Sequence, residues 1–171
     1  MNRELRRAMQ RAERKGNQPK RRPGKRFANP LGYVTEGMML LKDHDDYATK
    51  WAVLARTAWF RITQGVGTHQ DSNNVMAALN ITQALKETLG YPDEPGDIPR
   101  AEQALIALCE RGNQLGKLTP KAEEIVAVNE LLALHDDFLM CITVKQMEDA
   151  LQYAKKQIGA GKATVIKRPE L

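Results

Sequence analysis

Two His-Asp steps, His44-Asp45 and His135-Asp136, contain the side chains of this sequence best suited to chemistry. An imidazole and a carboxylate can bind one transition metal together, and a metal-bound water is a strong nucleophile at neutral pH. The third histidine, His69, follows a glycine-rich stretch and could supply a further ligand. A hydrolytic metal centre is therefore one interpretation. In the other interpretation, His44 and His135 pack within helices and the aspartates face solvent.

The two steps are similar to the metal ligands of the helical His-Asp phosphohydrolases, in which other helices supply more histidines and aspartates. That resemblance implies a hydrolase with His44, Asp45, His135 and Asp136 at the metal. Two dipeptides do not make up such a ligand set, so we favour packed histidines. We therefore expect no metal and no cofactor.

Other catalytic motifs are absent from the sequence. It has no HExxH motif, no P-loop and no nucleophile elbow. Ser72 is the lone serine, and we expect it to cap a helix. Cys109 and Cys141 lack a partner at CxxC spacing and fall in apolar helical patterns, which predicts two buried, reduced thiols. These observations favour a protein without enzymatic activity.

The charge of the chain is concentrated at its N-terminus. Residues 1–26 carry eleven basic and two acidic side chains, a net charge of +9, whereas the other 145 residues carry a net charge of −4. Arginine outnumbers lysine eight to three in this basic arm, and its planar guanidinium pairs well with phosphate. We therefore predict that the arm binds nucleic acid through the following residues: Arg3, Arg6, Arg7, Arg11, Arg14, Lys15, Lys20, Arg21, Arg22, Lys25 and Arg26. The alternative is a solubilising or nuclear-targeting tail.

Two resemblances bear on this prediction. Residues 3–15 resemble the arginine-rich RNA-binding helices of lambdoid phage antitermination proteins. The whole chain resembles small helical proteins of phages and mobile elements, most without an assigned function. The matching residues are the opening Asn2-Arg3-x-x-Arg6-Arg7-Ala8 and the late Leu134-His135-Asp136 followed by Thr143-Val144-x-x-Met147-Glu148-x-Ala150. The second resemblance implies either an accessory nucleic-acid-binding protein or an inhibitor of a host system.

The hydrophobic pattern predicts an all-α fold. We expect a basic arm over residues 1–34 (a short helix, then a Pro/Gly-rich linker), a bundle of about five or six helices over 35–159, and a short basic tail over 160–171. No apolar run is long enough to span a membrane, and no apolar segment follows the basic N-terminus, so we expect a cytoplasmic protein.

Capping residues predict where the helices begin and end. A first helix should cover 38–62 with a break near 42–46, and the next should begin at Asp71 or Ser72 and end at Gly90. The remaining expected boundaries are Pro99 at a helix start, Gly112 or Gly116 at its end, a start at Thr119-Pro120 and an end at Gly159. Residues 143–146 match a capping box, where the chain either bends or runs through as one long helix.

Two further patterns lie within the bundle. The residues around His44 and around His135 share the form Leu-Leu-x-x-His-Asp-Asp-aromatic, which either records a duplicated helical hairpin or arose by chance. The segment 125–144 is apolar almost all round, which indicates a buried central helix and a possible dimer.

Together, these patterns lead us to expect a non-enzymatic protein whose arm contacts nucleic acid while its body docks a protein partner or itself. The alternatives are an inhibitor that acts by protein contact alone and the metal-dependent phosphohydrolase.

Overall fold

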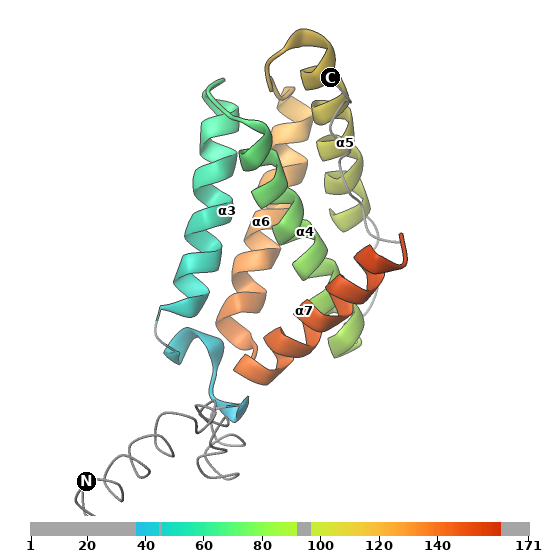
Figure 1. Cartoon of the computed structure of the whole chain (residues 1–171). Helices are drawn as coiled ribbons and strands as arrows, with labels where there is room; N and C mark the ends of the chain where they lie inside the picture. Colours follow the sequence, from blue (N-terminus) through green and yellow to red (C-terminus); the bar gives the residue numbers. More distant parts are fainter. Residues whose placement is uncertain (1–36, 45, 92–96, 162–171) are drawn as a thin grey trace, which may run out of the picture. The chain divides into compact units, whose positions relative to one another are not determined.

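The computed structural model describes residues 37–44, 46–91 and 97–161, and this part of the chain is all-helical, as predicted. The predicted N-terminal helix, its linker and the C-terminal tail lie outside the described residues. Figure 1 shows the bundle. Its elements are the 3-10 helix η1 (Leu41–Asp43) and the α-helices α3 (Tyr47–Thr63), α4 (His69–Leu89), α5 (Asp97–Leu115), α6 (Ala122–Cys141) and α7 (Val144–Gly159).

Helices α4 and α6 form the centre of the bundle. Helix α4 contacts α3, α5, α6 and α7, while α6 contacts α3, α4, α5 and η1. Helix α5 packs alongside α6, and α7 crosses the C-terminal half of α4 at a steep angle (Figure 1). The predicted central position of the apolar segment 125–144 is therefore confirmed.

The buried side chains form two hydrophobic cores, which we name after the helix that covers each. The α5-side core consists of Ala55, Ala58, Trp59, Ile62, Val75, Met76, Ala78, Leu79, Ile98, Ala101, Leu105, Leu108, Leu118, Val128, Leu131 and Leu132. The α7-side core consists of Leu41, Ala48, Ile81, Ala84, Leu85, Phe138, Leu139, Ile142, Met147, Ala150 and Ala154. Both cores draw on α3, α4 and α6, so these three helices run through the whole bundle.

Helix α4 begins earlier than predicted. Thr68, not Asp71 or Ser72, is its N-cap, and Asp71 is the acidic partner of the capping box. The residue that precedes this N-cap, Gly67, passes Ile62 so closely that a Cβ atom there would lie 2.5 Å from Ile62 Cγ1. The predicted end at Gly90 is confirmed, with φ of 64° in the left-handed region.

The starts of α5 and α6 also differ from the prediction. Helix α5 begins at Asp97, so Pro99 lies inside its first turn, where a missing N–H costs no helical bond. It continues through Gly112 and ends before Gly116, the second predicted end. Helix α6 begins after the N-cap Lys121, whose N–H donates to Glu124 Oε2 at 2.7 Å, so Thr119 and Pro120 precede it.

The predicted capping box forms and separates α6 from α7, so the chain does not run through as one long helix. The Gln146 N–H donates to Thr143 Oγ1 at 3.3 Å, and the Thr143 N–H donates to Gln146 Oε1 at 2.8 Å. The residues just before η1 meet this junction, because Leu40 and Thr143 form an isolated antiparallel bridge and the Val144 N–H donates to the Met39 carbonyl at 3.0 Å. Helix α7 ends at Gly159, as predicted.

The two copies of the Leu-Leu-x-x-His-Asp-Asp pattern adopt different structures. The first covers η1 and the start of α3, with Asp46 in the left-handed region at φ of 55°. The second is an uninterrupted stretch of α6. The two copies therefore do not form matching helical hairpins.

Candidate functional site

His135 lies in the interior of the bundle, on α6 between Leu132 of the α5-side core and Phe138 of the α7-side core. Its Nδ1 lies 3.0 Å from Thr82 Oγ1, and the Thr82 hydroxyl donates to the Ala78 carbonyl at 2.8 Å. Because a hydroxyl has a single proton, this network assigns the imidazole proton to Nδ1, which donates to Thr82. The buried Nε2 has no hydrogen-bond partner among the described residues.

Burial keeps this imidazole neutral. The side chain is fully buried, and burial lowers the pKa of His135 from 6.5 to about 4. The Asp136 carboxylate raises the pKa and the Arg56 guanidinium lowers it, but both effects are smaller than that of burial. The prediction that His135 is a packed core residue is therefore confirmed.

Asp136 points toward α3 rather than toward the interior. Its Oδ2 accepts from Arg56 Nε at 2.9 Å and lies 2.8 Å from Arg56 Nη2. Its buried Oδ1 has no hydrogen-bond partner in the described part of the chain. The second His-Asp step thus places its imidazole and its carboxylate against different helices, α4 and α3.

The first His-Asp step is partly described. His44 follows η1, and its ring contacts Tyr47 edge-on with a centroid separation of 6.2 Å. Asp45 lies outside the described residues. Among the described residues, no three His, Cys, Asp or Glu side chains lie close enough together to hold a metal ion. The phosphohydrolase ligand set therefore gains no support from the geometry.

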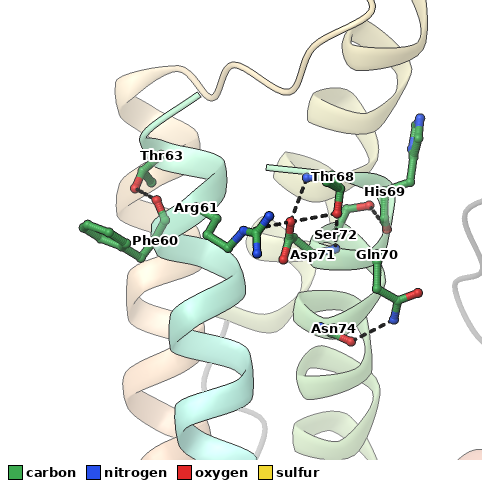
Figure 2. Close-up of polar contacts among 9 residues, drawn as sticks. All are labelled: Phe60, Arg61, Thr63, Thr68, His69, Gln70, Asp71, Ser72 and Asn74. Atoms are coloured by element: carbon green, nitrogen blue, oxygen red, sulfur yellow. Dashed lines mark hydrogen bonds and ion pairs between the residues drawn. The ribbon is translucent and has the colours of Figure 1, made fainter. Parts of the chain in front are cut away.

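Figure 2 shows a polar cluster where α3 meets the start of α4. Asp71 Oδ2 accepts from the Thr68 N–H at 2.7 Å and from the Thr68 hydroxyl at 2.8 Å, and Arg61 Nε lies 3.5 Å away. Burial raises the pKa of Asp71, but these hydrogen bonds and the Arg61 charge outweigh it, so the pKa lies below its usual value. His69, the possible third ligand, is exposed at the start of α4. This cluster caps a helix.

The remaining candidates from the sequence have structural roles or lie outside the description. Ser72 is buried and donates to the His69 carbonyl at 2.8 Å, so it caps no helix start. Cys109 is buried as predicted, and burial raises its pKa, whereas Cys141 is exposed, because it lies on the outer side of the last turn of α6. All eleven basic residues of the arm precede residue 37 and lie outside the described residues.

Helices α3 and α6 lie side by side and antiparallel, as two contacts show. Arg56 of α3 pairs with Asp136 of α6. One turn further along α3, Trp59 Nε1 donates to Asn129 Oδ1 at 3.0 Å, and Asn129 precedes Asp136 by seven residues on α6. The numbers rise on one helix as they fall on the other. These contacts also fix which side of each helix faces the other.

Exposed apolar side chains border this contact on its outer side. Val53 and Phe60 lie one turn either side of Arg56, and Phe60 points away from α4 (Figure 2). On α6, Val126, Ala133 and Met140 recur at intervals of seven residues, each within about one turn of Asn129 or Asp136. The four larger side chains, Val53, Phe60, Val126 and Met140, are 53–63% exposed. We call these five residues the α3–α6 face.

The two helices of this face carry opposite charge. Helix α3 has three basic and no acidic side chains, namely Lys50, Arg56 and Arg61. Helix α6 has five acidic and no basic side chains, namely Glu123, Glu124, Glu130, Asp136 and Asp137. The sequence analysis missed the face, although the seven-residue spacing and this separation of charge are both readable signals.

Comparison with protein-family models, with curated proteins and with solved structures finds no match for the chain. In the described part of the chain, no helix is both long enough and apolar enough to cross a membrane.

Proposed function

We propose that this protein is a non-enzymatic binding protein whose N-terminal arm contacts nucleic-acid phosphates while its helical body makes protein–protein contacts. The observation that carries the proposal is the separation of charge in the sequence, +9 over residues 1–26 against −4 over the rest. An arginine-rich segment neutralises phosphates and releases their counterions, which supplies sequence-independent affinity. A mildly acidic body adds no such affinity of its own.

The α3–α6 face supports the second half of the proposal. Large apolar patches on a protein surface mark interaction sites, and the α3–α6 face gathers four exposed apolar side chains on two neighbouring helices. Phe60, which is 63% exposed, is the largest apolar side chain of the face, and aromatic residues are enriched at protein interfaces. The body therefore offers a contact surface that is separate in sequence from the arm.

A substitution series in the full-length chain tests the role of the arm. One variant carries Gln in place of Arg6, Arg7, Arg11 and Arg14. The control carries Gln in place of four exposed lysines of the body, Lys42, Lys117, Lys155 and Lys156. Both variants lose four positive charges, so net charge alone cannot distinguish them.

Binding is measured by fluorescence anisotropy with a labelled single-stranded RNA and with a DNA duplex. Loss of four phosphate contacts near physiological salt should weaken the arm variant roughly a hundredfold, whereas the control should bind like the wild type. Equal affinity of all three proteins for both probes would contradict nucleic-acid binding by the arm.

The protein-contact inhibitor is the second candidate, and the same exposed face favours it. In that case the arm serves solubility, and neither probe binds the wild type with measurable affinity. The proposed function and this alternative therefore give opposite results in the same titration.

A further inference from the structure

We infer that the α3–α6 face binds a second copy of this chain, forming a symmetric dimer with α3 of one protomer on α6 of the other. The inference deepens the second half of the proposed function by naming its protein partner. It rests on the charges of the two helices and on the spacing of the exposed apolar residues, and it does not depend on what the arm binds.

The charge separation selects this arrangement of the two copies. A two-fold axis parallel to the helices places the basic α3 of each copy over the acidic α6 of the other. A two-fold axis across the helices would place α3 on α3 and α6 on α6, so like charges would meet. Complementary potentials favour the first arrangement and oppose the second.

Among the described residues, three charged side chains of α3 and α6 make no ion pair: Lys50, Asp137 and Glu123, which lies in the first turn of α6. Lys50 and Asp137 are the two that can join the copies. Most charges of α3 and α6 are satisfied within the chain, as in the Arg56–Asp136 and Arg61–Asp71 pairs. Lys50 and Asp137 are both exposed, and neither makes an ion pair within the described part of the chain. With the axis parallel to the helices, Lys50 of one copy lies about one helical turn from the level of Asp137 of the other, within reach of a lysine side chain.

The apolar residues fit the same packing. In this dimer α3 of one copy runs antiparallel to α6 of the other, because the two helices are antiparallel within a chain and the axis preserves their directions. Val126, Ala133 and Met140, spaced by seven residues, form a straight seam along α6. The small Ala133 between two larger side chains leaves room for Phe60 of the other copy, whose side chain is 63% exposed.

Light scattering of the full-length, nuclease-treated protein tests the dimer, because no nucleic acid can then bridge two chains. We expect twice the 19.2 kDa mass of one chain, falling toward a single chain on dilution. Val126→Asp should raise the dissociation constant roughly tenfold or more, because it buries a charge in the seam. Val66→Asp is the matched control: Val66 is 62% exposed in the turn after α3, outside the face.

A charge exchange tests the orientation. Lys50→Glu and Asp137→Lys should each raise the dissociation constant roughly fivefold or more, because each affects two pairs per dimer. The double variant should return close to the wild type. The control Lys155→Glu, on α7, should have no effect. A single-chain mass for the wild type at every concentration, a Val126→Asp dimer as tight as the wild type, or no recovery in the double variant would overturn the inference.

Discussion

At the scale of single residues, His135 is the most consequential side chain in the bundle. Its imidazole is fully buried beside two hydrophobic cores, with Nδ1 bonded to Thr82 and Nε2 without a partner among the described residues. A buried polar atom without a partner costs free energy, and protonation of Nε2 would add an unpaired buried charge. The folded protein therefore tolerates neutral His135 and resists its protonation.

This resistance predicts a pH dependence of stability. The pKa of His135 is about 4 in the folded state, against the ordinary histidine value of 6.5, so below pH 6.5 the unfolded chain takes up a proton that the folded chain does not. The free energy of unfolding should therefore fall between pH 6.5 and pH 4, with a total loss from this group of about 3 kcal/mol.

Urea unfolding, followed by circular dichroism across this pH range, measures the effect. His135→Asn keeps a donor near the Nδ1 position and does not titrate, so its stability should change less between pH 6.5 and pH 5 than that of the wild type. His69→Asn, which replaces an exposed histidine, should keep the wild-type slope. If His135→Asn shows the wild-type slope as well, then His135 is not the group that titrates.

The sequence was enough to favour packed histidines over a metal site at the His-Asp steps. It was not enough to predict the direction in which each side chain points. Two dipeptides without further ligands indicated packed histidines, and His135 is packed. The direction of each side chain was not readable, because Asp136 turns to α3 only once the helices pack. Burial of Cys141 was predicted wrongly for the same reason: an apolar pattern all round a helix does not tell which side meets solvent.

At the scale of the helices, local chemistry set some boundaries and tertiary contacts set others. The Thr143–Gln146 capping box and the left-handed glycine after α4 follow from sequence alone, because each signal is complete within a few residues. The starts of α4 and α6 were harder to predict from the sequence. Several capping residues compete near Thr68, and near Lys121 a buried Glu124 and its ion pair with Arg111 hold the turn that begins α6.

The starts of α7 and α6 can be tested by removing one threonine hydroxyl at a time. Thr143→Ala removes the acceptor of the Gln146 N–H and should lower the free energy of unfolding by about 1 kcal/mol. Thr119→Ala should leave it nearly unchanged, because the carbonyl of Thr119 accepts from Arg111 and α6 begins after Lys121. Denaturant titrations of both variants measure the difference. An equal loss in both would show that Thr119 also caps a helix.

At the scale of the whole molecule, the fold class followed from the sequence more readily than the contacts between helices did. The all-α bundle was predictable, because hydrophobic periodicity reports each helix directly. The pairing of α3 with α6 was not, because these helices are far apart in sequence and neither their shared cores nor their two polar pairs have a local signature. The α3–α6 face exists only through that pairing, so the seven-residue spacing and the charge of each helix, although readable, could not show that the two helices share one face.

The measurement that tests the central claim most directly is the salt dependence of nucleic-acid binding by the full-length chain. Binding through phosphates makes the logarithm of the association constant fall linearly with the logarithm of the salt concentration. With Gln in place of Arg6, Arg7, Arg11 and Arg14, the slope should be shallower than that of the wild type by about 3. Identical slopes for the wild type and this variant would contradict a nucleic-acid-binding arm.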